Sequence, residues 1–185
     1  MKNYYINRIC LTLILMCSFS CSSDLDFNQV NDLKIEPVVE GNFSYFDAPA
    51  TAFVTSNGSE RLWGYDDQDF DVFRDKYFNS YLQRADFYFA INNTINRAFS
   101  LSIVLFDGND NPLTTIKINV PAYSGSTNII TRTEIFQNTR LDLLKSTRKM
   151  RFLVELEPGS GPALNQNSTG NLVLRSSATV YLAIQ

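Results

Sequence analysis

Hydrophobic and polar residues alternate along much of the second half of the chain. One stretch places Phe87, Phe89 and Ile91 on a common face, and alternate residues from 99 to 105 do the same. The pattern continues through residues 116–120, 150–156 and 172–184. Alternation with a period of two is typical of antiparallel strands that bury one face, so each stretch is predicted to be a strand.

Turn-forming residues separate these stretches, and two more strands are expected at residues 33–39 and 42–46. Turns rich in Asn, Asp, Gly and Pro occupy residues 92–94, 107–112, 124–126 and 158–162. Short strands at this spacing predict an all-β fold, an antiparallel β-sandwich. The order of strands and turns from Phe87 to Ile130, about a quarter of the chain, resembles that of immunoglobulin-like or late-embryogenesis-type sandwiches. The resemblance implies an immunoglobulin-like sandwich.

Two stretches depart from this alternation and predict one or two short helices. Phe70, Phe73, Tyr77 and Tyr81 follow one another at spacings of three and four, the stripe of an amphipathic helix over residues 69–81. Aspartates just before and within its first turn suit the positive end of a helix dipole. A second short helix or turn is predicted within residues 138–147.

The first 20 residues have the character of a secretory signal. Lys2 and Arg8 provide a basic start without acids, and residues 9–17 are apolar except for Thr12. A bilayer core requires roughly 20 apolar residues in a helix, whereas a signal sequence uses about 7 to 15. The run is therefore interpreted as a signal peptide and not as a membrane span.

A cysteine preceded by small residues follows this run. Ser18-Phe19-Ser20-Cys21 resembles the looser lipobox of Bacteroidota lipoproteins, and the Ser- and Asp-rich stretch 22–27 resembles their export signal to the cell surface. A solvated tether is the alternative for that stretch. The resemblance implies a signal peptide at 1–20 and a lipidated Cys21. The polar, aperiodic composition after Cys21 predicts a flexible tether at 21–32, and the alternation described above assigns the β-sandwich domain to 33–185. The resemblance also implies a lipid anchor in the outer membrane that faces the cell surface or, alternatively, the periplasm.

Composition narrows the chemistry that the folded part can perform. Without residues 1–20 the chain has 14 basic and 19 acidic side chains and no run of Lys or Arg, so nucleic acid is not an expected partner. All three cysteines lie at or before residue 21, and there is no histidine. These features exclude Ser-His and Cys-His nucleophiles and Cys- or His-ligated zinc or copper sites. No cofactor and no metal are predicted.

Three local motifs suggest chemistry, and each has a simpler interpretation. Ser146 and Lys149 satisfy the Ser-x-x-Lys pattern of penicillin-interacting enzymes, but the companion motifs are absent. Asp67 begins an alternation of oxygen ligands like that of a calcium loop, yet Val72 stands where glycine is needed. An irregular calcium site is the remaining alternative there. Residues 107–111 alternate similarly, and a hairpin turn explains them.

The residues predicted to contact a ligand lie in the stretch 58–69, which is expected to be a loop. Trp63, the only tryptophan, and Tyr65 stand beside Asp66 and Asp67. Loops at the ends of a sandwich are common binding surfaces, and Trp and Tyr often carry contact energy. The four residues would contact a partner or stack on a sugar ring. A loop packed onto the sandwich by its tryptophan is the alternative.

Together these features favour a non-catalytic surface lipoprotein that binds an envelope protein or a glycan. The alternative is a structural or assembly subunit of a surface complex, in which the final strand or an exposed sheet edge pairs with a neighbour. A carboxylate-based glycoside hydrolase ranks third, and no catalytic residue is assigned. The expected partners are the membrane, through the lipid anchor, and the protein or glycan.

Lipidation of Cys21 is directly testable. Cys21→Ala should leave full-length precursor that incorporates no labelled fatty acid, because the acceptor thiol is gone, and Cys17→Ala serves as the control that keeps the label. Loss of label from Cys17→Ala with retention on Cys21→Ala would show that the cysteine has been misassigned.

Overall fold

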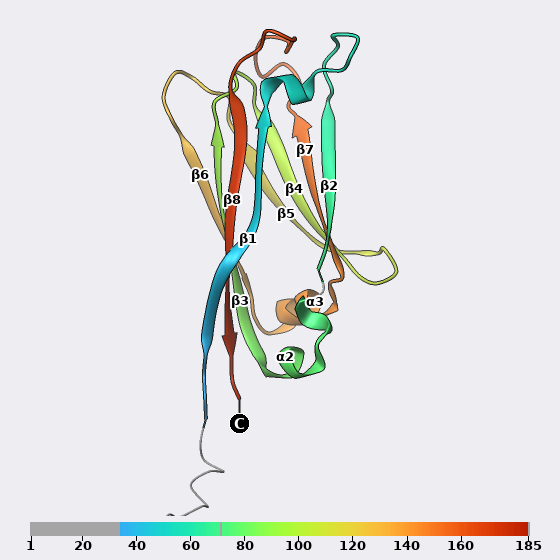
Figure 1. The fold of residues 1–185 in the computed structure, drawn as a ribbon, viewed down its shortest axis with the longest axis vertical. Coiled ribbons are helices and arrows are strands. Elements are labelled where there is room, and N and C mark those ends of the chain that lie inside the picture. The colour runs from blue at the N-terminus through green and yellow to red at the C-terminus, as the bar shows by residue number, and fades with distance from the viewer. Residues whose placement is uncertain (1–33, 71, 185) are drawn as a thin grey trace, which may run out of the picture. The chain divides into compact units, whose positions relative to one another are not determined.

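The computed structural model describes residues 34–70 and 72–184, and its compact unit comprises Ile35–Ile184. The predicted signal peptide, Cys21 and the tether lie outside the described residues. Within the described part, strands form two antiparallel sheets (Figure 1). The first sheet has the order β1 (Val38–Pro49), β8 (Asn171–Leu182), β3 (Leu82–Asn93) and β6 (Ile129–Phe136). The second has the order β2 (Trp63–Asp69), β7 (Lys149–Leu156), β4 (Phe99–Phe106) and β5 (Pro112–Val120).

The predicted all-β sandwich is confirmed, and the strand order defines its topology. Each strand of the first half pairs with its counterpart from the second half: β1 with β8, β2 with β7, β3 with β6, and β4 with β5. This nested pairing is the topology of a jelly roll and differs from the immunoglobulin strand order. The immunoglobulin-like resemblance was drawn from local order alone, and local order does not report which distant strands pair.

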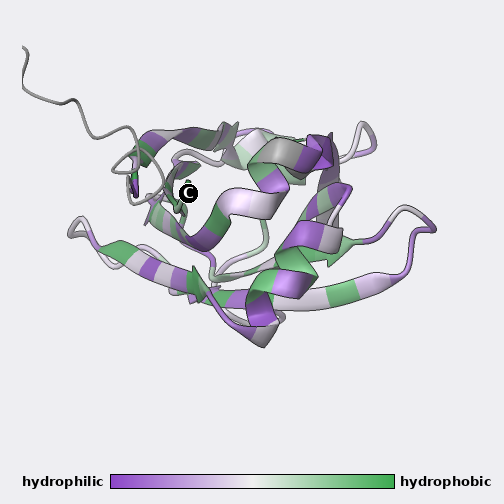
Figure 2. Ribbon diagram, turned by 90° about the horizontal axis from the view of Figure 1, so that it is seen from below, coloured by the Kyte–Doolittle hydropathy of each residue, from purple (hydrophilic) through white to green (hydrophobic). Residues whose placement is uncertain are grey.

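The core lies between the two sheets, where the predicted alternation is confirmed. Phe87, Phe89 and Ile91 of β3 are buried, and the alternate residues of β4 and β7 face them from the second sheet. Phe43 of β1 extends the cluster, with its ring centroid 4.8 Å from that of Phe87. Figure 2 shows the two layers end-on, with hydrophobic and hydrophilic residues alternating along the strands.

The final strand lies inside its sheet. β8 is hydrogen-bonded to β1 on one side and to β3 on the other. The expectation that this strand could pair with a neighbouring molecule is therefore wrong, because both of its edges are already occupied. Only an edge strand retains free backbone groups for such pairing.

The N-terminal strand differs in its limits from the prediction. Residues 42–46 belong to the single long strand β1, whose register shifts between Asn42 and Tyr45. Upstream of β1, Ile35 forms an isolated bridge with Ile184. The two strands expected here are therefore one strand and one bridge.

The helices lie at one end of the sandwich, and the first is shorter than predicted. α2 (Lys76–Tyr81) follows the 3-10 turn η3 (Val72–Arg74), while residues up to Asp69 belong to β2. Asp75 begins α2, and its side chain accepts a hydrogen bond from the Phe78 amide at 2.9 Å. Spacings of three and four fit two separate helical turns as well as one helix. The second predicted helix is confirmed as α3 (Thr139–Ser146) (Figure 1).

Among the described residues, none of the helices has the length and apolar character needed to cross a membrane.

A buried arginine joins the loops at the opposite end, next to the 3-10 helix η2 (Ala50–Phe53). Arg97, only 4% exposed, donates hydrogen bonds to the Glu60 carboxylate at 2.6 Å and to the Glu157 and Pro162 carbonyl oxygens at 3.1 and 3.2 Å. Glu60 also accepts from the Leu164 amide at 2.7 Å. The loop that leads into β2 is thereby bound to the β3–β4 turn and to the loop before β8.

Two glycines at this end allow the cost of backbone strain to be distinguished from the cost of a steric clash. Gly170 has φ +101° and Gly58 has φ +84°, a region that costs residues other than glycine about 1–2 kcal/mol. A Cβ at Gly170 would stand 2.2 Å from the Thr94 carbonyl oxygen, whereas one at Gly58 would meet nothing within 4 Å. In chemical denaturation, Gly58→Ala should lower the free energy of unfolding only by the cost of the strained backbone. Gly170→Ala should lower it substantially more, because the added Cβ also meets the Thr94 carbonyl oxygen. Equal losses would show that the contact at Thr94 is easily relieved.

Candidate functional site

All four predicted contact residues lie on β2, at the edge of the second sheet. Within the described residues β2 pairs with β7 alone, in a register that sets Trp63 opposite Glu155 and Asp67 opposite Arg151. The loop expected at residues 58–69 therefore gives way to a strand at Trp63. Gly and Asp are uncommon in strands, so the composition of this stretch concealed a strand that its pairing with β7 stabilises.

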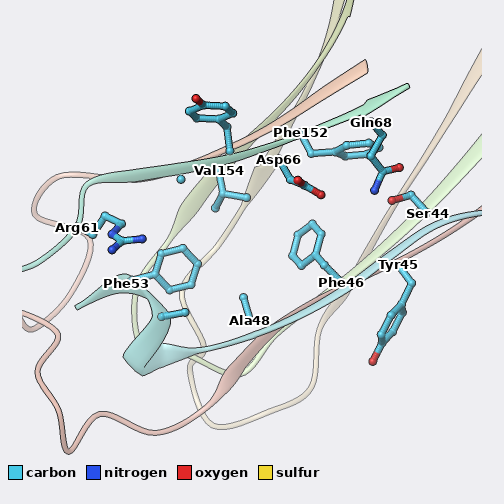
Figure 3. A pocket seen from close by; sticks show the side chains of 13 residues that line it. Ser44, Tyr45, Phe46, Ala48, Phe53, Arg61, Asp66, Gln68, Phe152 and Val154 are labelled. Atoms are coloured by element: carbon cyan, nitrogen blue, oxygen red, sulfur yellow. The ribbon is translucent and has the colours of Figure 1, made fainter. Parts of the chain in front are cut away.

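The alternation of β2 separates the four residues onto two faces. Trp63, Tyr65 and Asp67 are on the outer face of the sandwich, and Asp66 faces inward, toward a cleft between the sheets (Figure 3). The structure thus brings three of the predicted residues together and places the fourth in a different environment. Sequence neighbours on a strand point to opposite sides, and the loop interpretation did not include that constraint.

The outer face carries two exposed aromatic rings that stack on each other. Trp63 and Tyr65 are 57% and 55% exposed, with centroids 5.9 Å apart and planes inclined by 17°. Arg151 of β7 lies over the Tyr65 ring, 4.6 Å from its centroid, and 5.3 Å from the Phe106 centroid of β4. We call Trp63, Tyr65 and Arg151 the aromatic platform. The exposure of Trp63 shows that it does not pack the strand onto the core.

An ion pair fixes the arginine of the platform. Arg151 donates from Nε and a terminal nitrogen to the two carboxylate oxygens of Asp67, at 2.6 and 2.7 Å. The hydrogen bond from Arg151 lowers the pKa of Asp67, against a smaller opposing effect of burial. The pair is therefore present at neutral pH and weakens only as the pH falls through that lowered pKa. Its bidentate geometry fixes the position of the guanidinium over the Tyr65 ring.

Sequence reasoning did not identify Arg151 as part of this site. The alternation of Met150 and Phe152 indicates that Arg151 is a polar residue on the outer face of a strand. It does not indicate that β2 is the neighbouring strand. Only the β2–β7 register brings it to Asp67, 84 residues away in the sequence. Cross-strand neighbours of this kind have no local signal.

A cleft of about 250 Å³ opens between edge strands β1 and β2, on the other face of β2. Phe46 of β1, Phe53 of η2 and Phe152 of β7 form much of its apolar lining (Figure 3). Asp66 and Gln68 project into it from β2, and Tyr45 points away from it. The remaining lining residues are Ser44, Ala48, Ala52, Arg61, Gly64, Tyr65 and Val154, so Tyr65 of the aromatic platform also borders this cleft. We call this the β1–β2 cleft.

Three polar side chains that line this cleft make no hydrogen bond or ion pair with other described residues. Among the described residues, no hydrogen bond or ion pair reaches the side chains of Arg61, Asp66 or Gln68. An apolar cavity with a few convergent polar groups is the usual form of a binding site. The cleft is therefore a second candidate site, which the sequence did not indicate.

The structure gives simpler roles to the other chemical motifs. Ser146 donates to the Asp142 carbonyl oxygen at the end of α3, and Lys149 pairs with Asp110. Asp107 accepts from the amides of Asn109 and Asn111 at 2.8 and 2.9 Å in the β4–β5 hairpin. In residues 34–70 and 72–184, no group of three or more carboxylates, histidines or cysteines is placed to hold a metal.

The sequence matches no protein-family model and no curated protein. Several solved structures are similar at low identity. One, a protein of Parabacteroides distasonis assigned as secreted, is 16% identical, with a TM-score of 0.43, over 64% of this chain and 37% of its own. The structure of the infectious bursal disease virus Gx strain is 8% identical, with a TM-score of 0.40 over 80% and 32%. The enzymatically active domain of bacteriophage CBA120 tailspike protein 4 is 8% identical, with a TM-score of 0.39 over 80% and 19%. The chain spans less than half of each.

The exposure of Trp63 makes a stability prediction. Trp63→Ala should leave the melting temperature nearly unchanged, because the side chain is mostly in solvent. Phe152→Ala, which removes a buried ring of the core, should cost about 3–5 kcal/mol. Thermal unfolding of the two variants measures both effects. A loss at Trp63 comparable to that at Phe152 would mean that the tryptophan serves packing.

Proposed function

We propose that this protein is an outer-membrane lipoprotein, anchored through Cys21, whose jelly-roll domain is a non-catalytic binding module for a glycan. The signal-like N-terminus, the lipobox-like residues before Cys21 and the Ser- and Asp-rich stretch after it support the anchor and its orientation toward the cell surface. The aromatic platform supports the binding function. Among residues 34–70 and 72–184, the platform is the feature that marks the outer face of the second sheet as a binding surface.

The single observation that carries the proposal is the exposed, nearly parallel pair of Trp63 and Tyr65. Large aromatic rings that remain mostly exposed to water commonly mark a binding surface. The apolar face of a sugar ring stacks on such rings, and its hydroxyl groups need charged or polar partners at the edge. Asp67 accepts and Arg151 donates hydrogen bonds at that edge, and their mutual ion pair keeps both in place.

Hydrolysis is a weaker proposal for the same strand. A glycosidase needs two carboxyl groups that flank one bond from the same site. Asp66 and Asp67 point to opposite faces of β2, and Asp67 is already bound by Arg151. The arrangement fits binding of a sugar better than its cleavage.

Glycan capture by the full-length lipoprotein, purified in detergent, tests the proposal. On an array of bacterial and host glycans, the wild type should bind a defined subset, and Trp63→Ala should lose at least about tenfold of that signal because the stacking surface is removed. Tyr88→Ala is the matched control, since Tyr88 is an exposed aromatic residue on β3 of the other sheet. Absence of binding by the wild type, or equal loss in both variants, would contradict a glycan site on the platform.

A further inference from the structure

In the part of the chain that the structure describes, no strand pairs with the outer edge of β2, which therefore presents a row of unpaired backbone groups. At the two ends of the strand, the Leu156 amide donates to the Leu62 carbonyl and the Phe70 amide donates to the Arg148 carbonyl, each at 2.8 Å. Antiparallel pairing alternates, so the even-numbered residues of β2 are those bonded to β7. The amide and carbonyl groups of its odd-numbered residues therefore point away from the sheet. These residues are Trp63, Tyr65, Asp67 and Asp69.

The β1–β2 cleft lies along this same edge. A strand added to β2 would direct alternate side chains into the cleft, beside the inward positions Gly64, Asp66 and Gln68. A Cβ built on Gly64 meets nothing within 4 Å, so there is room for an apolar side chain from another strand. Phe46 and Phe53 from the opposite wall provide an apolar surface for it.

The opposite open side of the sandwich shows an edge whose inward charge is satisfied. Glu134 of β6 is buried on the inner face, and it accepts hydrogen bonds from Arg132 and Arg140, both at 2.8 Å. An inward charge on an edge strand opposes pairing with any strand that would bury it without a partner of opposite charge. Asp66 has the corresponding inward position on β2 but receives no cation from the described residues.

The charge of β2 selects the partner. The strand contains three aspartates and no basic residue, and of the three only Asp67 is paired with a cation among the described residues, Arg151 of β7. Pairing with β2 of a second copy would set acids near acids, which is unfavourable, whereas a basic strand would gain from the contact. A second copy of this chain is therefore a poor occupant, and a basic peptide is a good one.

We infer that β2 is a docking edge for an extended peptide of a partner protein, which adds to the second sheet as a further strand. The peptide places an apolar side chain over Gly64, between Phe46 and Phe53, and a lysine or arginine two residues away beside Asp66. Main-chain hydrogen bonds to the odd-numbered residues supply affinity, and the cleft supplies specificity. This site is on the inner face and edge of β2, distinct from the aromatic platform on the outer face.

A labelled peptide, Thr-Val-Thr-Val-Thr-Lys-Thr-Val, titrated against the full-length lipoprotein in detergent tests the inference by fluorescence anisotropy. The peptide should bind, and a version with alternate N-methylated amides should not, because it keeps the side chains and loses the strand hydrogen bonds. Amide exchange measured by NMR should slow at Tyr65 and Asp67, and stay unchanged at Gly64 and Gln68, which are already bonded to β7.

Two variants test the cleft without disturbing the fold. Gly64→Val fills the space and should lower the affinity for the peptide by at least about tenfold. Gly41→Val is the control and should leave the affinity unchanged, because Gly41 lies on β1 outside the cleft and is equally unhindered. Asp66→Lys should reverse the charge preference by about two- to fivefold, so that the peptide with glutamate in place of lysine binds better. Glu40→Lys, an exposed charge on β1, is the control for net charge.

The outcomes also separate this inference from the glycan proposal. Gly64→Val should retain glycan capture, because its change lies on the inner face. The docking edge would be overturned if the peptide failed to bind or if its N-methylated version bound equally well. It would also be overturned if sedimentation showed that the protein self-associates and that this association accounts for the slowed amide exchange at Tyr65 and Asp67. None of these outcomes would affect the glycan result.

Discussion

The ion pair of the buried Arg97 with the partly buried Glu60 is the interaction on which the geometry of the site depends. Arg97 sits in the turn between β3 and β4, and Glu60 lies in the loop that delivers the chain to β2. Breaking such a pair by removing one partner typically costs about 3–5 kcal/mol, because the remaining charge stays buried without compensation. The pair therefore holds the start of β2 against the end of the sandwich. The first residues of β2 contribute to both candidate sites, Trp63 to the aromatic platform and Gly64 to the β1–β2 cleft.

Rigid support of this kind suits a strand that has only one neighbour. Among the strands that the structure describes, β7 alone is hydrogen-bonded to β2. The short sequence of β2 contains glycine and three aspartates, which do not favour strands by themselves. Attachment at Arg97 and burial of Phe70 beyond its other end compensate for that weakness. The strand can then present polar and aromatic side chains to solvent without being lost from the sheet.

One strand consequently offers two different chemical surfaces. Its outer face presents flat aromatic rings with an ion pair at the edge, which suits the stacking and hydroxyl groups of a sugar. Its inner face and free edge present an apolar cleft, an unpaired carboxylate and open backbone groups, which suit an extended basic peptide. Because successive side chains of a strand alternate, changes at Trp63 and at Gly64 act on separate surfaces although the residues are adjacent.

The sequence by itself determined the fold class and most of the core. The alternation through Phe87–Ile91 and the later strands requires one buried and one solvated face, and the hairpin at Asp107 follows from its turn residues. It also singled out Trp63 as a candidate contact residue, and the structure shows that this side chain is exposed. Only the tertiary structure decided that residues 63–69 form a strand, that the sheets have jelly-roll order, and that Asp66 parts from Asp67 while Arg151 joins it. Local patterns report how each segment meets water, whereas register and strand order arise from pairing between segments far apart in the chain, for which a single sequence carries no local signal.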